Sequence, residues 1–477
     1  MLGLDCNAAP RAAVRGVRRN GGALKSALNN AAIVSRQKLV RQGIPAARTR
    51  CTAEGFTVRP KERGAHRGSE FRASGPAVKI GVFTEVYRPI VNGVVASVES
   101  LTEELRARGH EAYTFAPRIP KGVEAIGRVF FMPSLPLPAR TEYRLTVPLV
   151  ARRNKARFLS QCDVIHSHSL FVTGWMAQYY AHYRFRVPLV FTYHTMLERY
   201  SHYSPLGKRV TDQLTRELTK GYANSADAVI APTQAVASQL RDAGVVAPLS
   251  VVPTGIQLER FRAAGAAEGR AVRTRFGVGL EAPLLLLVSR LAHEKSVPLA
   301  FQALRKIREA QPAVRLLLVG AGPLADSLKD EAEEASLGDS VIFAGLLPHE
   351  ELPAIYAAAD IFIFPSTSET QGLVLAESFA AGLPVVAALS PQTRDVFGPN
   401  RAGELVDGAD EMARAVVGLL ADRERYREAS AHARAASAAF DIKATAGRVV
   451  AVYEAVVANR AGTAAMADFE DLFDLVG

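Results

Sequence analysis

The segment from Phe364 to Glu377 carries the clearest chemical signal in this sequence. It reads FPSTSETQGLVLAE, a short apolar run, a polar loop and a second apolar stretch that predicts a helix. Glu369 lies in the loop, and Gly372 opens the helix that holds Glu377. Such strand-to-helix junctions form the ligand-binding edge of parallel sheets, where free amides and the helix dipole attract phosphate. Glu377, in the first turns, could accept hydrogen bonds from ribose hydroxyls.

This junction supplies most of the positions that are candidates for binding the phosphates and the ribose of a nucleotide. They are Thr370, Gln371, Gly372, Leu373 and Val374, together with Glu377. Two glutamates eight positions apart are also compatible with an exposed loop acid and a charge on a helix surface, because short motifs recur by chance. Support has to come from the other junctions of the chain.

Two cations follow another apolar run. Arg290 and Lys295 come directly after Leu284–Val288, which predicts a strand of the same sheet. Two cations opposite a phosphate-binding helix start suit a departing nucleotide diphosphate. The alternative is a surface ion pair with Glu294.

Glycines mark two further junctions. Gly320 and Gly322 follow the apolar run Arg315–Val319, where they form either a plain turn or a close approach to a ligand. Gly93 follows the first apolar run of the chain and could let its backbone approach a pyrophosphate, or it could be an ordinary turn.

Histidines follow two predicted strands of the first half. His166 and His168 end one strand, and His194 follows Leu189–Phe191. A metal site would need carboxylates beside these histidines, and no Asp-x-Asp occurs in the sequence, so we predict no metal site. His194 is the candidate for contact with a sugar hydroxyl or a phosphate, and one of the other two is expected to be a core or supporting residue.

The elements that position these residues alternate between strands and helices. Residues 78–256 and 257–440 each read as such a series, which is typical of parallel sheets covered by helices on both faces. We predict an α/β fold of two Rossmann-like, doubly wound domains that face a cleft. We expect an irregular linker at 262–280, a helix at 441–458 that crosses back to the first domain, and a frayed tail at 459–477.

Charge is distributed unevenly along the chain. The net charge of +11 resides in residues 1–77, because residues 78–477 hold 43 basic and 43 acidic side chains. The body therefore needs no nucleic acid as a partner. The leader is compatible with a plastid or mitochondrial transit peptide, a disordered basic arm, or a start codon assigned too far upstream. Three cysteines, with only Cys162 in the body, fit a reducing compartment.

The first half of the body also contains a basic segment with interleaved apolar residues. Residues 78–254 carry 21 basic and 13 acidic side chains, and residues 255–477 carry 22 and 30. The candidate acceptor or membrane residues are Arg140, Arg144, Arg152, Arg153 and Lys155. They are interleaved with apolar side chains between 145 and 158, which favours a segment that lies on anionic lipid; the alternative is a solvated helix face. No apolar run reaches the ~18 residues that span a bilayer.

With these motifs, residues 78–458 resemble the retaining GT-B glycosyltransferases of family 4. The resemblance rests on Glu369 and Glu377, on Arg290 and Lys295, and on the paired domains. Residues 192–203 (TYHTMLERYSHY) and 368–372 (SETQG) look more particularly like the diacylglycerol α-glucosyltransferases. The sequence departs from many relatives at Ser289, where glycine is usual, and at Thr254, where asparagine is frequent.

The resemblance implies that residues 78–256 are the acceptor domain and residues 257–440 the donor domain. It also implies a role for each candidate. Glu377 would hold the ribose, Glu369 would contact the donor hexose, and the amides of Gly372 to Val374 would bind the phosphates. Arg290 and Lys295 would stabilise the leaving diphosphate. His194 would lie against the sugar and Gly93 beside the pyrophosphate.

The resulting expectation is a metal-independent enzyme without a cofactor. It would move a hexose, most simply glucose, from a UDP-sugar or GDP-sugar to a lipid such as diacylglycerol, with retention by a front-side path. The alternatives are a GDP-mannose-dependent transferase acting on a phosphoinositide or glycan, and a nucleotide-sugar-binding scaffold. A dinucleotide site is disfavoured, because no Gly-x-Gly-x-x-Gly follows Val82 or Val288. We expect a cytoplasmic, peripheral membrane protein, or a plastid one if residues 1–77 are a transit peptide.

Overall fold

The computed structural model describes residues 77–118, 128–137, 140–148, 153–196, 208–398 and 402–474. The leader, and with it the three interpretations of residues 1–77, lies outside this range apart from Ala77. Side chains are described over a narrower range, which omits 137–143, 153–155, Lys208 and 461–474.

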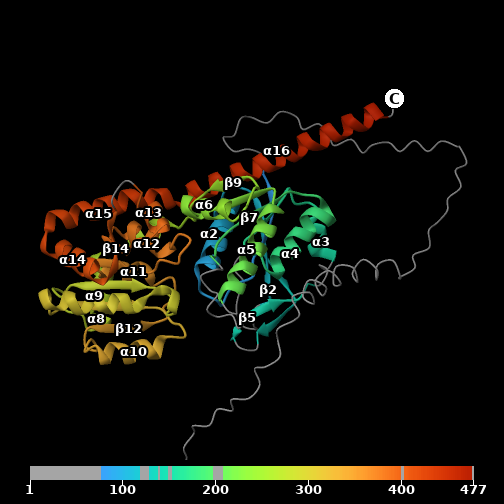
Figure 1. Ribbon diagram of the computed structural model, residues 1–477. Helices are drawn as coiled ribbons and strands as arrows, with labels where there is room; N and C mark the ends of the chain where they lie inside the picture. Colours follow the sequence, from blue (N-terminus) through green and yellow to red (C-terminus); the bar gives the residue numbers. More distant parts are fainter. Residues whose placement is uncertain are drawn as a thin grey trace, which may run out of the picture. The chain divides into compact units, whose positions relative to one another are not determined.

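The first half of the described chain forms a seven-stranded parallel sheet (Figure 1). In spatial order its strands are β3 (Val129–Met132), β2 (Glu111–Pro117), β1 (Lys79–Phe83), β6 (Val164–Ser167), β7 (Leu189–Thr192), β8 (Ala228–Ala231) and β9 (Leu249–Val251). The strand order reverses between β1 and β6. Ligands of doubly wound sheets bind at such a reversal, beyond the carboxyl ends of the strands.

Alternate residues of these strands face two apolar layers. Ile80 and Val82 contact one layer, which contains α2 (Gly93–Ala107) and the first turns of α16 (Ile442–Asp474). Phe83 contacts the other, to which α3 (Arg153–Leu159), α4 (Val172–Gln178), α5 (Lys208–Asn224) and α6 (Gln234–Asp242) contribute. The sheet is therefore buried on both faces, as expected of parallel strands.

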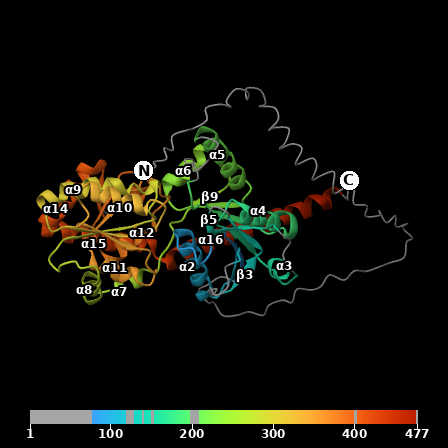
Figure 2. The same ribbon diagram turned by 90° about the horizontal axis from the view of Figure 1, so that it is seen from below.

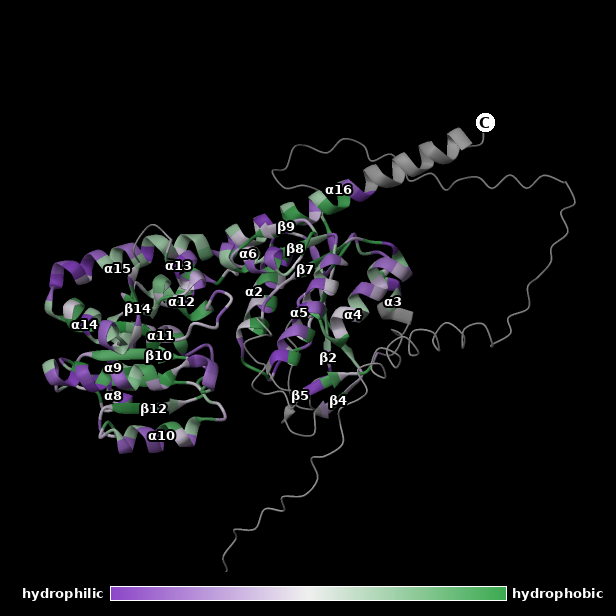
Figure 3. Cartoon of the chain, viewed as in Figure 1, coloured by the Kyte–Doolittle hydropathy of each residue, from purple (hydrophilic) through white to green (hydrophobic). Residues whose placement is uncertain are grey.

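The second half forms a six-stranded parallel sheet (Figure 2). Its order is β12 (Val341–Gly345), β11 (Arg315–Val319), β10 (Leu284–Val288), β13 (Ile361–Phe364), β14 (Val385–Ala388) and β15 (Gly403–Val406). In Figure 3 these strands are coloured as hydrophobic, while α10 (Ala325–Glu334) and α15 (Arg423–Ser437) show hydrophilic bands. The order reverses between β10 and β13, the strands that precede Arg290 and Glu369.

Two apolar layers cover this sheet as well. One contains residues of α7 (Leu258–Ala263), α8 (Ala266–Arg275), α11 (Leu352–Ala358), α12 (Leu373–Ala381), α13 (Pro391–Phe397) and α15. The other contains residues of α9 (Val297–Ala310), α10 and α14 (Gly408–Ala421). The predicted fold class, two Rossmann-like doubly wound units, is confirmed by this arrangement.

The chain passes between the two sheets at two adjacent places. The amide of Ile256 donates to the carbonyl of Phe440, and the amide of Ile442 donates to that of Ile256. A Cβ atom on Gly255 would lie 2.7 Å from the Cα of Ile442, so only glycine permits this approach. Beyond the crossing, α16 packs against α2 of the first sheet.

The expected linker at 262–280 is wrong. Residues 266–275 form α8, which is anchored by the buried Arg273. Its guanidinium donates to the carbonyl of Ala358 at 2.8 Å and pairs with Asp360 at 2.8 Å. The tail expected at 459–477 is also different, because α16 continues to Asp474. The sequence pattern did not predict α8, because this helix shows little apolar periodicity and is held by residues 85 and 87 positions away.

The basic segment is not one amphipathic helix. It divides into β5 (Arg140–Thr146), which pairs antiparallel with β4 (Ser134–Leu137), and α3. Arg144 donates from Nε to the Ser134 hydroxyl at 2.9 Å and so crosses the hairpin. The side chains of Arg140, Arg152, Arg153 and Lys155 lie outside those the structure describes. The segment thus folds as a hairpin strand followed by a helix, and its contact with anionic lipid stays a prediction.

Candidate active site

The strand reversal of the second sheet brings Lys295 and Glu369 together. Lys295 Nζ donates to Glu369 Oε1 in a close ion pair, although the two residues are 74 positions apart. The hydroxyls of Ser366 and Ser368 donate to the carbonyl of Glu294 at 3.2 and 2.8 Å and fasten the two loops to each other. A lysine and a glutamate are thus held at one sheet edge, both only partly exposed.

Arg290 lies on the loop after β10 and is half buried. It makes no hydrogen bond or ion pair with any side chain or backbone group that the structure describes. Its positive charge is therefore not used to hold the fold together. This distinguishes Arg290 from Lys295, whose charge is neutralised by Glu369.

The start of α12 requires a glycine. Gly372 has φ of 79°, in the left-handed region, and a Cβ atom there would lie 3.0 Å from the ring of Phe364. The amides of the first turn have no acceptor within the helix and are available to an anion. Gly372, Leu373 and Val374 are therefore placed as a phosphate-binding helix start would need them.

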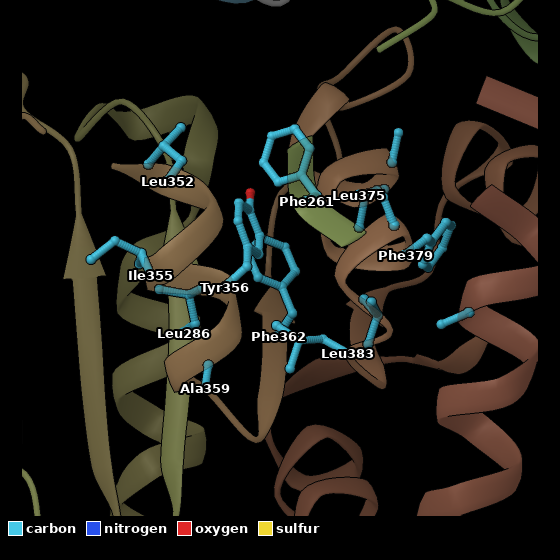
Figure 4. Close-up of a cluster of buried hydrophobic side chains, with 14 of the residues drawn as sticks. Phe261, Leu286, Leu352, Ile355, Tyr356, Ala359, Phe362, Leu375, Phe379 and Leu383 are labelled. Atoms are coloured by element: carbon cyan, nitrogen blue, oxygen red, sulfur yellow. The ribbon is translucent and has the colours of Figure 1, made fainter. Parts of the chain in front are cut away.

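Glu377 is buried in the same helix, with 5% of its surface exposed. The hydroxyl of Tyr356 donates to its Oε2 at 2.8 Å, and Nε2 of His349 lies 3.5 Å from Oε1. Figure 4 shows Tyr356 within an apolar cluster that includes Phe261 and Phe362. Burial and the Glu377 carboxylate raise the pKa of the Tyr356 hydroxyl well above its usual value, so it stays a proton donor. These contacts fix the orientation of the carboxylate.

A small, partly open pocket of about 20 Å³ lies beside Glu377. Its lining comes from α2 of the first sheet and from elements around the second: Ala96, Ser100, Gly255, Ile256, Gln257, Arg260, Phe261, His349, Leu373 and Glu377. Gly93, at the start of α2, also faces this region, because a Cβ atom there would lie 3.4 Å from Leu373 Cδ1. Gly93 and the start of α12 thus come together as expected.

Thr370 and Gln371 use their side chains to join the two halves of the chain. The Thr370 hydroxyl donates to the carbonyl of His194 at 3.0 Å. Gln371 exchanges two hydrogen bonds with the backbone of Thr254, at 2.7 and 3.0 Å. The carbonyl of Thr370 is also used, because it accepts from the Thr233 hydroxyl at 3.1 Å. The backbone amides of the two residues remain for a sugar nucleotide, which narrows the binding role predicted for them.

Gly320 and Gly322 are explained by packing. A Cβ atom on Gly320 would lie 1.9 Å from the carbonyl oxygen of Ser289, and one on Gly322 would lie 2.2 Å from that of Leu291. Gly320 also has φ of 139°. The turn therefore presses on the loop that carries Arg290, which supports the plain-turn alternative and gives both glycines a positioning role.

Three histidines lie at the edge of the first sheet. His194 Nε2 and His168 Nδ1 are 2.7 Å apart, and their rings stack. His166 contacts the hydroxyls of Tyr453 and Thr192, each at 2.7 Å. Burial lowers the pKa of His166 to about 3 and that of His194 to about 4, and holds the pKa of His168 well below its usual value. His194 is therefore neutral at physiological pH. Its Nε2 is taken by His168, so its Nδ1 is the nitrogen that can contact a bound sugar nucleotide.

We expect stability to fall as the pH drops from 7.5 to 5. The unfolded chain protonates these histidines near pH 6.5, whereas the folded protein resists protonation down to about pH 4, so acid favours unfolding in this window. At pH 5 His166 alone should cost on the order of 2 kcal/mol. Melting temperatures across this range test the expectation. The variant H166N should have a lower melting temperature than the wild type at pH 7.5, but its melting temperature should fall less as the pH drops. Parallel falls in the two proteins would contradict the low pKa of His166.

Four site residues were not singled out in these roles from the sequence: Glu85, His168, His349 and Tyr356. Glu85 accepts hydrogen bonds from the amide and hydroxyl of Thr173, at 2.9 and 2.8 Å, and so holds the start of α4. Glu85 follows β1 and could have been found as an acid at a sheet edge. Tyr356 and His349 reach Glu377 from a separate helix and loop, and no sequence pattern indicates that contact.

Two family models match consecutive parts of the chain. The model described as Glycosyltransferase Family 4 matches residues 91–260, and that described as Glycosyl transferases group 1 matches residues 271–436. An alpha-monoglucosyldiacylglycerol synthase of Streptococcus pneumoniae is 31% identical over 347 residues, which cover 72% of this chain and 78% of that protein. The chain belongs to glycosyltransferase family 4. It is a glycosyltransferase with the GT-B fold.

Other similar proteins of this family differ in substrate. A GDP-mannose-dependent alpha-mannosyltransferase of Mycobacterium tuberculosis is 30% identical over 73% of this chain and 90% of its own length. Among solved structures, Anabaena HepE in complex with UDP aligns with a TM-score of 0.64 at 21% identity, over 79% of this chain and all of that one. That likeness supports the fold alone.

No group of three or more His, Cys, Asp or Glu side chains within the described part of the chain is arranged to hold a metal ion. No helix in the described ranges is both long and apolar enough to cross a bilayer.

Proposed function

We propose that this family 4 glycosyltransferase moves glucose from UDP-glucose to diacylglycerol and retains the α configuration. The observation that carries the proposal is the buried Glu377, which Tyr356 orients beside a pocket at the start of α12. This helix directly follows the loop in which Glu369 pairs with Lys295. The choice of acceptor is supported by the similarity to two alpha-monoglucosyldiacylglycerol synthases, of Streptococcus pneumoniae and Acholeplasma laidlawii. In this proposal residues 78–256 form the acceptor domain and residues 257–440 the donor domain.

Each candidate then has a task in donor binding. Glu377 accepts hydrogen bonds from the ribose hydroxyls, and the amides of Gly372, Leu373 and Val374 bind the diphosphate. Gly93 leaves room beside it, as its approach to Leu373 suggests. His194 presents its neutral ring to the sugar.

The transfer itself requires charge stabilisation rather than a protein nucleophile. The anomeric C–O bond to the diphosphate breaks, its electron pair stays on the phosphate oxygen, and Arg290 and Lys295 stabilise that charge. The acceptor hydroxyl forms the new C–O bond on the same face, and its proton passes to the leaving phosphate. Glu369 faces the positive charge that develops on the sugar. When the sugar nucleotide is bound, Lys295 would therefore contact both Glu369 and the diphosphate.

The test supplies UDP-glucose, UDP-galactose and GDP-mannose separately, with diacylglycerol in detergent. Release of UDP and formation of an α-glucosyl lipid with the first donor alone is the expected result. Nucleotide release that does not depend on diacylglycerol and gives no lipid product would show that diacylglycerol is not the acceptor.

A second candidate is transfer of mannose from GDP-mannose to a phosphoinositide or glycan. The observation in its favour is the similarity to the mycobacterial mannosyltransferase, which covers as much of this chain as the first relative does. The same three-donor assay separates the two functions, because only this one releases GDP.

Replacing Glu377 with glutamine should weaken nucleotide binding. The amide keeps the size and some hydrogen bonding, but it loses bonds to a charged acceptor worth ~1.5–3 kcal/mol, so UDP affinity should fall about 10- to 100-fold. Calorimetry with UDP measures this loss. E428Q, on the exposed face of α15, is the matched control. Unchanged UDP affinity in E377Q would place the ribose elsewhere.

Turnover should persist in EDTA. The charge on the departing diphosphate is met by Arg290, Lys295 and the start of α12, none of which needs a metal. The measurement is UDP release before and after chelation, with magnesium or manganese added back. Complete loss that either metal restores would show that these cations do not suffice.

We further propose that the enzyme works as a peripheral protein on an anionic membrane. Support comes from the excess of eight basic side chains in residues 78–254 and from the lipid acceptor. Binding to anionic vesicles should then weaken as salt is raised, because salt screens these charges.

A further inference from the structure

One helix of the first half exposes an aromatic surface. Phe171, Trp175, Tyr179 and Tyr183 are 47, 55, 48 and 76% exposed, and they recur every fourth residue. We call these four side chains the aromatic face. The opposite side of the same helix is buried through Met176, Ala177, Tyr180 and Ala181. A helix of a water-soluble surface normally turns polar residues outward, and here the outward side is aromatic.

The backbone geometry keeps this face aligned. Four residues of an α-helix overshoot a full turn by about 40°. The α-helix α4 continues as a π-helix over Tyr179–Phe185, in which roughly 4.4 residues make a turn, so four residues fall short by a similar angle. The two deviations offset each other, and Tyr179 and Tyr183 stay in line, with ring centroids 6.4 Å apart.

The charged side chains on the aromatic helix itself are positive, although Asp227 lies 3.5 Å from its His182. Residues 171–186 contain Arg184 and Arg186 and no acidic residue, and both arginines are exposed. The neighbouring helix α5 is linked to α4 by the hydrogen bond from the Tyr222 hydroxyl to the Gly174 carbonyl, 2.9 Å. It exposes Val210, Leu214 and Leu218 at the same spacing of four. The aromatic face thus combines aromatic rings with cations.

The aromatic face is also close to the site along the chain. It begins three residues after His168, whose ring contacts His194. Glu85, on the loop after β1, holds the first turn of α4 through Thr173. The orientation of this helix is therefore tied to the sheet edge where the acceptor must arrive.

We infer that the aromatic face inserts into the headgroup region of a phospholipid bilayer and presents the acceptor side of the cleft to the membrane. Tyrosine and tryptophan favour this depth, because their rings are apolar and their polar tips remain hydrated. Arg184 and Arg186 would meet anionic headgroups. The inference rests on the proposed lipid acceptor. It adds that the aromatic face is the membrane-binding surface, and that insertion of its rings contributes to binding in addition to charge attraction.

Trp175 makes the test direct, because it is the only tryptophan of the chain. The full chain is mixed with vesicles of phosphatidylcholine, and with vesicles of equal parts phosphatidylcholine and phosphatidylglycerol. We expect a blue shift of the Trp175 emission and quenching by lipids brominated near the headgroup. Part of the binding should survive about 0.5 M salt, where charge attraction is largely screened.

Matched variants identify the surface. The double variant Y179S and Y183S keeps the reporter and should lower vesicle partitioning about ten-fold or more. V246S with L280S removes two exposed apolar side chains elsewhere and should change it less than about two-fold. Turnover on a short-chain, water-soluble diacylglycerol should be equal in all three proteins, while turnover on vesicle-embedded acceptor falls only in the tyrosine variant.

Several outcomes would overturn the inference. They are the absence of a blue shift with either vesicle, equal partitioning of the two double variants, binding that high salt abolishes completely, and a shift caused by self-association without lipid. A blue shift in a protein that glycosylates no lipid would instead leave the membrane surface standing and refute the proposed function.

Discussion

Replacing Glu369 with glutamine is expected to lower kcat about 10²- to 10³-fold and to leave the KM for the donor nearly unchanged. The carboxylate faces the sugar as positive charge develops, so its interaction strengthens in the transition state and contributes little before it. In the free enzyme Glu369 is paired with Lys295. Removing the carboxylate charge frees Lys295 for the diphosphate, so UDP should bind at least as tightly as before.

Steady-state kinetics and calorimetry with UDP separate the two effects. E309Q, on the exposed surface of α9, is a matched control that should behave as the wild type. If E369Q turns over normally but loses affinity for UDP, the roles of Glu369 and Glu377 are reversed. If both properties are unchanged, the sugar is bound at another place.

Replacing Arg290 with glutamine should lower kcat/KM by a similar factor, about 10²- to 10³-fold. A guanidinium stabilises the departing diphosphate with two parallel hydrogen bonds, which an amide cannot supply. Arg290 has no partner among the described residues, so its loss should leave the melting temperature unchanged. Lysine at this position keeps the charge but not the planar fork, and R290K should recover only part of the activity.

The control for Arg290 is R305Q, an exposed arginine on α9. Kinetics with UDP-glucose and thermal unfolding are measured on both variants. A large drop in melting temperature for R290Q would mean that Arg290 supports the fold. Normal kcat/KM would leave Lys295 and the helix start as the only groups on the diphosphate.

The sequence predicted the fold well where one strand or one helix carried its own signal. Leu284–Val288 and the helix at 373–381 coincide with β10 and α12, and the two parallel series predicted both sheets. Strand-to-helix junctions then placed Glu369, Lys295 and Glu377 at one edge. These strands could be recognised because parallel strands are buried on both faces, so their sequences are continuous apolar runs.

Contacts between distant segments could not be predicted in this way. Nothing local indicates that Thr370 binds the carbonyl of His194, that Tyr356 orients Glu377, or that Gly320 packs on Ser289. Each depends on how two segments are superposed in space. The helix α8 was not predicted for a related reason. Its apolar periodicity is weak, and Arg273 stabilises it by binding Ala358 at the end of α11 and Asp360 just after it.

The position of α16 has a consequence for synthesis of the protein on the ribosome. Ala446, Val449, Tyr453 and Val456 complete the apolar layer on one face of the first sheet, and Tyr453 is the hydroxyl partner of His166 (Figure 1). Translation delivers β1 long before this helix, so the strands of the first sheet wait for residues 446–456 before this apolar layer closes. Domains usually fold in the order in which they emerge. Here the second sheet, whose strands all precede α16, can close before the first.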